Sequence, residues 1–146
     1  MAFYDEVHST KKYRLGTRKR DVAGNEYIYL KGITNCADGS WVTFDEAHVT
    51  TLAVANGQGR VAIANGAVDA ATKYGWFTIY GVESGLCLAS FADNGVVYLT
   101  STDGSVDDTD VAGDQVYGAI GRSARNTTTG MSTFELNYPE VLDAGN

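Results

Sequence analysis

The chain has 146 residues, of which 44% are hydrophobic and 20% charged, and its formal net charge is −7. This length suits one domain, and the composition is that of a folded globular protein rather than a disordered chain. The sequence contains no apolar run of the ~20 residues that a membrane helix needs, and its polar start lacks the apolar stretch of a signal peptide. We therefore expect a protein that is made in a cytoplasm and has no membrane partner.

The charge is distributed unevenly along the chain. Residues 1–20 carry six basic residues against two acidic ones, a net charge of +4, whereas residues 21–146 carry five against sixteen, a net charge of −11. The six basic residues are Lys11, Lys12, Arg14, Arg18, Lys19 and Arg20. This asymmetry predicts an extended basic N-terminal arm, residues 1–20, on a β-rich domain, residues 21–146, with the arm contacting another surface. The alternative is a first strand whose solvated face is basic.

Strand signals dominate the rest of the chain, because seventeen glycines interrupt nearly every window in which a helix could form. Short helical turns are expected only at residues 44–48 and 68–73. In the first strand, residues 26–31, tyrosines alternate with Ile28 and Leu30, which predicts that both faces are covered. The other expected strands are residues 41–44, 51–55, 60–64, 75–80, 86–91, 96–100, 115–122 and 133–138.

Turn residues set the expected connections. Asn94-Gly95 predicts a tight hairpin between residues 86–91 and 96–100, and Pro139 is expected just beyond the last strand. Eight or nine short strands at a spacing of roughly ten residues are typical of a sandwich or small barrel. The sequence therefore predicts a mainly β, single-domain antiparallel sandwich or small barrel with an extended N-terminal arm.

Residues suited to catalysis or metal binding are few. Cys36 and Cys87 lie among small or apolar neighbours, which favours buried, inert thiols. His8 and His48 are forty positions apart, and neither lies in a zinc-binding or hydrolase motif. We therefore predict that the protein is not an enzyme and has no catalytic residues, no cofactor and no metal. A small enzyme that pairs one of the cysteines with a histidine is the competing hypothesis.

Two charged segments suggest other ligands. The five aspartates of residues 103–114 could offer oxygens to Ca²⁺, but their spacing differs from that of a helix–loop–helix calcium site, so a solvated acidic loop is favoured. The basic arm could neutralise phosphates, but the remaining residues are strongly acidic and would repel a polyanion. No nucleic acid partner is expected, and the arm is predicted to contact a protein. Exposed Tyr, Trp and Arg residues are common interface anchors, and the candidates are Tyr4, Arg14, Trp76 and Tyr138.

Several segments resemble the small capsid decoration, or cement, proteins of tailed bacteriophages. At the N-terminal side these are Arg-Leu-Gly-Thr-Arg at residues 14–18 and Gly-Asn-Glu-Tyr-Ile-Tyr-Leu-Lys-Gly at residues 24–32. Further on, residues 60–64, 73–77 and 115–121 and the closing Phe-Glu-Leu-Asn-Tyr-Pro of residues 134–139 are similar to the same group. The likeness spans most of the chain, and it consists of strand and turn patterns without a chemical signature.

The resemblance implies a β-rich structural virion protein at the capsid surface. Such a protein binds the outside of the assembled shell of major capsid protein, often as a homotrimer, and stabilises it by cementing neighbouring subunits. Its expected location is the virion, after synthesis in the cytoplasm of the bacterial host. An adhesive or carbohydrate-binding β-module, such as a head fibre or tail-surface domain, is the alternative. The predicted capsid contacts are Tyr4, Lys11, Lys12, Arg14, Arg18, Lys19 and Arg20.

Overall fold

Strands follow one another from residue 7 to residue 141, as the sequence predicts. The computed structural model describes residues 3–142 and is mainly β, with 46% strand and 2% helix. One 3-10 turn, η1 (Phe3–Asp5), opens this part of the chain. The strands are β1 (Val7–His8), β2 (Arg18–Arg20), β3 (Glu26–Lys31), β4 (Trp41–Phe44), β5 (Thr50–Leu52), β6 (Gly59–Ala64), β7 (Tyr74–Leu86), β8 (Val96–Leu99), β9 (Val106–Asp107), β10 (Gln115–Gly121) and β11 (Met131–Val141).

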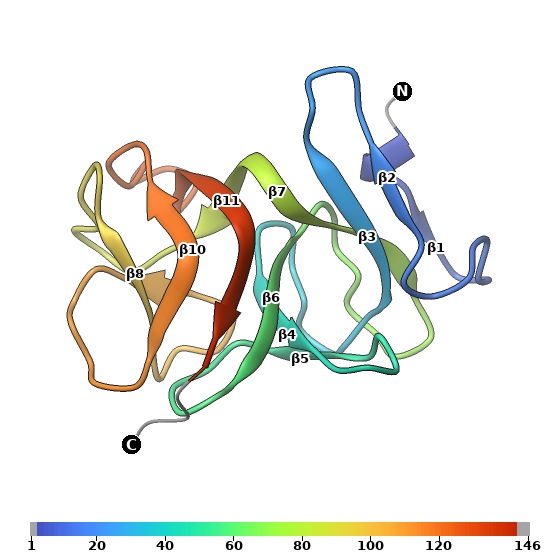
Figure 1. Cartoon of the computed structure of the whole chain (residues 1–146), viewed down its shortest axis with the longest axis horizontal. Coiled ribbons are helices and arrows are strands. Elements are labelled where there is room, and N and C mark those ends of the chain that lie inside the picture. The colour runs from blue at the N-terminus through green and yellow to red at the C-terminus, as the bar shows by residue number, and fades with distance from the viewer. Residues whose placement is uncertain (1–2, 143–146) are drawn as a thin grey trace.

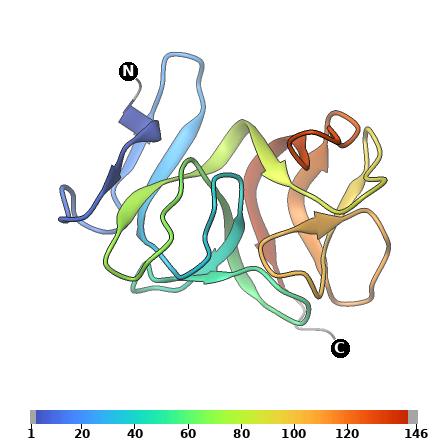
Figure 2. The same ribbon diagram turned by 180° about the vertical axis from the view of Figure 1, so that it is seen from behind.

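The strands pair antiparallel in the order β2-β3-β7-β6-β11-β10-β8-β9. β1 adds to β7, and β4 pairs with both β5 and β6. The sheet is strongly curved but does not close into a barrel, and the arrangement is consistent with a β-sandwich (Figures 1 and 2). The prediction of a mainly β, antiparallel fold is confirmed. Of the two predicted architectures, sandwich and small barrel, the closed barrel is not observed.

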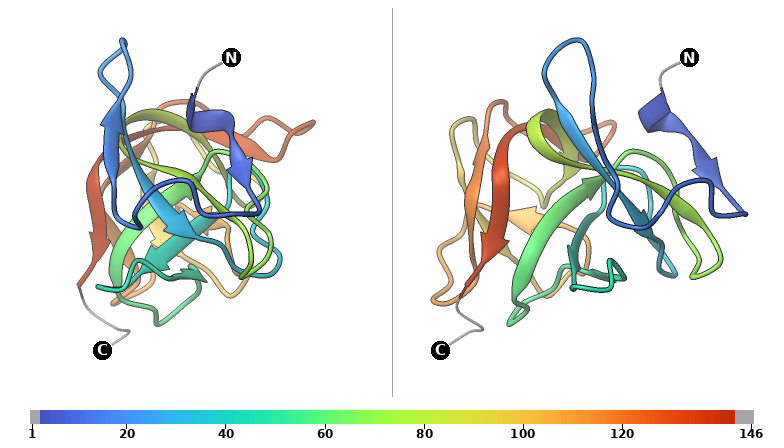
Figure 3. Two further views of the ribbon diagram at one scale, coloured as in Figure 1. Left: turned by 90° about the vertical axis from the view of Figure 1, so that its right-hand side faces the viewer. Right: turned by 45° about the vertical axis from the view of Figure 1, so that its right-hand side comes forward.

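The long strand β7 connects the two halves of the molecule (Figure 3). Its first half pairs with β3 as far as Tyr80, and its second half pairs with β11 from Tyr80 to Leu86. The turn between the two halves lies at Gly81, whose φ is +107°. A side chain at Gly81 would meet the Asn25 side chain, so the close approach of the β2–β3 loop requires glycine here.

The main core has two sides. On one side, β3, β4, β6 and the first half of β7 bury aliphatic residues around Phe77, including Ile28, Leu30 and Val42. On the other, Trp41 and Phe134 pack edge-to-face with ring centroids 4.9 Å apart, surrounded by side chains from β6, β8, β10 and β11. Both faces of β3 are covered, as its alternating sequence predicts.

The second face of β3 is covered by the N-terminal segment. Tyr27, Tyr29 and Trp76 form a buried aromatic cluster, and residues from the first fifteen positions pack on it. β1 pairs with β7 and β2 pairs with β3, so residues 3–20 lie along the sheet and form one packed unit with it. The basic segment, expected as an extended arm, is therefore held against the body over these residues, because its aromatic side chains bury apolar surface there.

Several local expectations were wrong. Residues 44–48 and 68–73 form turns rather than helix, and residues 86–91 do not form a separate strand, because β7 continues through Gly81 to Leu86. β8 consequently pairs with β9 and β10 instead of forming the predicted hairpin at Asn94-Gly95. The last strand extends to Val141, so Pro139 lies within β11, at an irregularity where its missing N–H is tolerated.

Candidate functional site

The three basic residues of β2 are divided between the two faces of the sheet. The register pairs Arg18 with Ile28, Lys19 with Tyr27 and Arg20 with Glu26. Because successive side chains of a strand point to opposite faces, the two arginines lie on one face and the lysine on the other. The predicted contact residues of this strand therefore do not form one surface.

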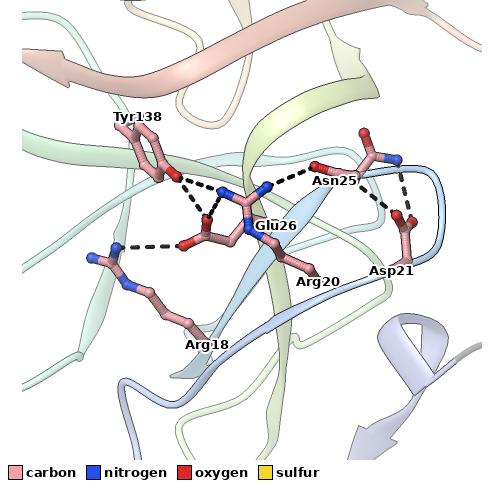
Figure 4. A network of polar contacts seen from close by, with 7 residues as sticks. Arg18, Arg20, Asp21, Asn25, Glu26 and Tyr138 are labelled. Carbon is pink, nitrogen blue, oxygen red and sulfur yellow. Dashed lines mark hydrogen bonds and ion pairs between the residues drawn. The ribbon is translucent and has the colours of Figure 1, made fainter.

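Arg18 and Arg20 converge on the nearly buried carboxylate of Glu26, together with Tyr138 from β11 (Figure 4). Glu26 Oε1 lies 2.9 Å from Arg20 Nη2 and accepts a hydrogen bond of 2.7 Å from the Tyr138 hydroxyl. Its Oε2 lies 3.5 Å from Arg18 Nη1. The side chain of Glu26 is only 9% exposed, whereas those of the two arginines are more than half exposed. The acid thus holds two solvent-facing guanidinium groups in place.

Tyr138 reaches this network from an unusual backbone position. Its φ is +48°, a left-handed conformation that is uncommon for a bulky residue. In the pairing of β10 with β11, Tyr117 lies opposite Glu140 and Ala119 lies opposite Leu136. Two positions along β10 therefore correspond to four along β11, so β11 bulges here. The hydrogen bond to Glu26 stabilises the neutral phenol and raises the pKa of Tyr138. The irregularity aims the hydroxyl across the sheet at β3.

A cavity of about 260 Å³ lies beside this network. We call it the arginine groove and define it by its lining residues: Arg18, Phe44, Arg60, Val61, Ile79, Tyr138 and Pro139. It shares Arg18, Phe44 and Arg60 with a wider hollow of about 500 Å³ that continues along Asp45, Glu46 and His48. Arg60 is bound to Glu140 through one contact of 2.7 Å between Nη1 and Oε1.

Next to the groove, two tyrosines form an exposed pair. The rings of Tyr80 and Tyr138 lie 5.2 Å apart, each residue is 36% exposed, and the guanidinium of Arg20 lies 5.4 Å from the centroid of the Tyr80 ring. Arginine from β2 and tyrosines from β7 and β11 give this face the residue types that are enriched at protein interfaces.

Lys19 and Tyr4 lie on the opposite face, in the aromatic cluster. Lys19 Nζ lies 5.1, 4.6 and 5.6 Å from the ring centroids of Phe3, Tyr13 and Trp76. Tyr4 stacks on Tyr27 with a centroid separation of 4.7 Å and an interplanar angle of 7°. Both side chains therefore contribute to the attachment of the N-terminal segment, and Trp76, a candidate exposed anchor, is 1% exposed.

The other predicted contacts, Lys11, Lys12 and Arg14, lie in the connection between β1 and β2 and are exposed. None of the three forms an ion pair with another residue of the range 3–142. This basic connection lies at one end of the long axis of the molecule, and β8 lies at the other (Figures 1 and 2). The seven predicted contacts thus occupy three separate places: the basic connection, the arginine groove with its rim, and the aromatic cluster.

Two aspartates of the acidic loop at residues 103–114 accept hydrogen bonds from backbone N–H groups. Asp114 is buried and accepts a hydrogen bond of 2.8 Å from the Asn56 N–H, and Asp108 accepts one of 3.0 Å from the Ala92 N–H. No group of three or more His, Cys, Asp or Glu residues within positions 3–142 is arranged to hold a metal ion.

The two histidines and the two cysteines pack against or hydrogen-bond to other parts of the fold. His8 Nδ1 lies 2.9 Å from the Tyr29 hydroxyl, and the His48 ring lies against Gly16. Cys36 and Cys87 are both buried and free, and burial raises the pKa of each thiol, that of Cys36 to about 12. The prediction of buried thiols is confirmed, and high thiol pKa values favour the unreactive protonated form.

Comparisons with known proteins return no relatives. The chain matches no protein-family model, and neither curated proteins nor solved structures give a match. No helix within residues 3–142 is long and apolar enough to cross a membrane.

The sequence indicated only part of the arginine groove and its rim of Arg20 and Tyr80. Arg18, Arg20 and Tyr138 were candidates because of their residue types, whereas Arg60, Phe44 and Tyr80 carried no signal. These residues come from strands far apart in the sequence. The pairing of β4 with β6, of β2 with β3, and of β7 with β3 and β11 brings them together. The assembled groove presents guanidinium donors and aromatic rings, which suits it to bind another molecule noncovalently.

Proposed function

We propose that the chain is a structural virion protein that binds the outer surface of an assembled bacteriophage capsid and cements neighbouring capsid subunits. The observation that carries this proposal is the arginine groove with its rim of Arg20 and Tyr80, an exposed face built from interface-type residues. Arginine and tyrosine supply large contact areas and directed hydrogen bonds. The sequence likeness of residues 14–18, 24–32 and 134–139 to capsid decoration proteins gives the face its proposed partner, the major capsid protein.

The arrangement of the predicted contacts supports a role in bridging. The exposed basic connection at Lys11, Lys12 and Arg14 is separate from the arginine groove, so one copy offers two places for contact with a shell. When one molecule contacts two subunits at once, the second contact is intramolecular, and modest individual affinities then give strong attachment. A homotrimer would multiply the number of contacts again. No catalytic step is part of this proposal.

Co-sedimentation tests the proposal. Purified protein is mixed with capsids of the phage that encodes the chain, assembled from major capsid protein without decoration protein, and with the unassembled capsid subunit. We expect saturable binding to the assembled shell in a fixed ratio to the capsid protein, weak binding to the free subunit, and an increase in the temperature at which the shell breaks open. A protein that stays in the supernatant at saturating concentration would contradict the proposal.

The exposed tyrosine pair favours a second candidate, an adhesive module that binds carbohydrate. Tyr80 and Tyr138 present ring surface beside hydrogen-bonding groups, and such a rim could contact sugar rings. Titration against a panel of bacterial surface glycans separates the two candidates. Specific glycan binding that Tyr80→Ala abolishes, together with no binding to capsids, would favour adhesion.

A further inference from the structure

We infer that the arginine groove accepts an extended peptide segment in which a carboxylate lies next to an aliphatic side chain. The inference rests on the proposed function, in which this segment belongs to the major capsid protein. The carboxylate binds between Arg18 and Arg60, and the aliphatic group lies against Phe44 and the ring of Tyr138.

The first argument is the number of free donors at the groove. A guanidinium group has five N–H donors in a fixed, planar arrangement that matches a carboxylate. Arg18 has one contact with Glu26, at 3.5 Å, and Arg60 has one with Glu140, at 2.7 Å. Their side chains are 56% and 63% exposed. Both arginines can therefore bind a further carboxylate without losing their present partner.

The second argument concerns the acids that surround the groove. Glu26 already accepts from the Tyr138 hydroxyl and contacts both Arg18 and Arg20. In the adjoining hollow, Asp45 Oδ1 accepts the N–H groups of Ala47 and Val49. The lining of the arginine groove itself contains Arg18 and Arg60 and no acidic residue, whereas Asp45 and Glu46 lie only along the wider hollow. The groove is therefore a basic site on a chain whose net charge is −7. A carboxylate from a partner is the complementary group.

The third argument is size. The cavity of about 260 Å³ lies below the range of roughly 300–1,000 Å³ that is usual for small-molecule sites. It connects at Arg18, Phe44 and Arg60 with the wider hollow, so the two spaces form a continuous depression rather than a closed pocket. This shape suits a pair of side chains from a longer segment that continues along the surface.

A peptide titration tests the chemistry of the groove directly. The probe is the capped tetrapeptide Gly-Asp-Leu-Gly, and the matched control is Gly-Asn-Leu-Gly, which has the same shape without the charge. The readout is the nuclear magnetic resonance of the arginine Nε–H groups. We expect the Asp peptide, at millimolar concentration, to shift the signals of Arg18 and Arg60 and to bind at least roughly tenfold more tightly than the Asn peptide.

Substitutions supply the second arm. The double variant Arg18→Gln, Arg60→Gln should lose peptide binding, whereas Arg122→Gln should retain it. Arg122 is the matched control, because it is also exposed and forms an ion pair of 2.9 Å with Glu135 outside the groove. Equal binding of both peptides, absence of shifts at Arg18 and Arg60 in the wild-type protein, or unchanged binding by the double variant would each overturn the inference.

The capsid assay separates this inference from the proposed function. If the wild-type protein and the double variant bind decoration-free capsids equally, capsid binding stands and the groove is not the contact. If the wild-type protein binds no capsid, the proposed function fails, and the capsid protein is removed as the source of the segment. A loss of capsid binding in the double variant but not in Arg122→Gln supports both.

Discussion

The half-buried carboxyl group of Glu83 makes the stability of the fold depend on pH. The side chain turns back along β7, where Oε2 lies 3.2 Å from the hydroxyl of Thr78, which is itself bound to Asn65. The pKa of Glu83 is raised from 4.5 to about 7, mainly by burial; hydrogen bonds from the Ser84 N–H and the Thr78 hydroxyl lower it in part, and the carboxylates of Asp38 and Asp5 raise it slightly. Glu83→Gln removes the charge and retains hydrogen-bonding capacity at this position.

The direction in which the free energy of unfolding changes with pH follows from proton binding to Glu83. Between pH 4.5 and about pH 7 the folded protein holds a proton on Glu83 that the unfolded chain has released, so the free energy of unfolding decreases as the pH rises through this range. One pKa unit corresponds to about 1.4 kcal/mol, and water that reaches the half-buried side chain reduces the effect. We expect Glu83→Gln to be more stable than the wild-type protein by roughly 1–3 kcal/mol at pH 8, and nearly equal to it at pH 4.

Urea unfolding followed by tryptophan fluorescence measures both proteins across this pH range. Glu46→Gln serves as the control, because Glu46 is an exposed glutamate in the turn after β4. Its effect should be small at every pH. The reasoning is refuted if the difference between Glu83→Gln and the wild-type protein is the same at pH 4 and pH 8, since a constant difference would come from packing rather than ionisation.

Three further predictions address the other contacts. Lys19→Met should lower the free energy of unfolding by about 1–2 kcal/mol in urea titrations, because the charge above three rings is lost while the side-chain stem is kept, and an equal effect of Lys12→Met would contradict this. Gly118→Ala should lower it by at least about 1 kcal/mol more than Gly24→Ala; both positions have positive φ, but only at Gly118 would a Cβ meet backbone, at 2.6 Å. Cys36 should react with a thiol reagent only after unfolding, and rapid labelling of the folded protein would show that its burial is not maintained.

The sequence predicted the mainly β class of the fold, and it predicted strand bounds best for short strands between clear turn residues. The bounds of β3 and β4 were predicted as they are observed, since each has β-branched or aromatic residues between turn residues. β7 was divided incorrectly because Gly81 looks like a strand end, whereas in the structure it allows one strand to turn and continue. A glycine in a strand permits either outcome, and the close contact with Asn25 that decides between them is not local.

The site was less predictable than the fold. Composition directed attention to Arg18, Lys19 and Arg20 alike, but Lys19 faces the other way from the two arginines and is held by aromatic rings. Once β2 is recognised as a strand, alternation alone separates these residues, so that signal was present in the sequence. The contribution of Arg60 was not, because it depends on how β6 pairs with β11.

The hydrogen bond between Tyr138 and Glu26 joins residues 112 positions apart. During synthesis the N-terminal hairpin emerges early, but the groove cannot exist until β11 has been made and has paired with β6 and β7. Such long-range pairing is a late and slow event in folding. Binding at this face therefore reports that β11 is in place, and a chain cut before β11 has the arginines without the tyrosine that binds Glu26.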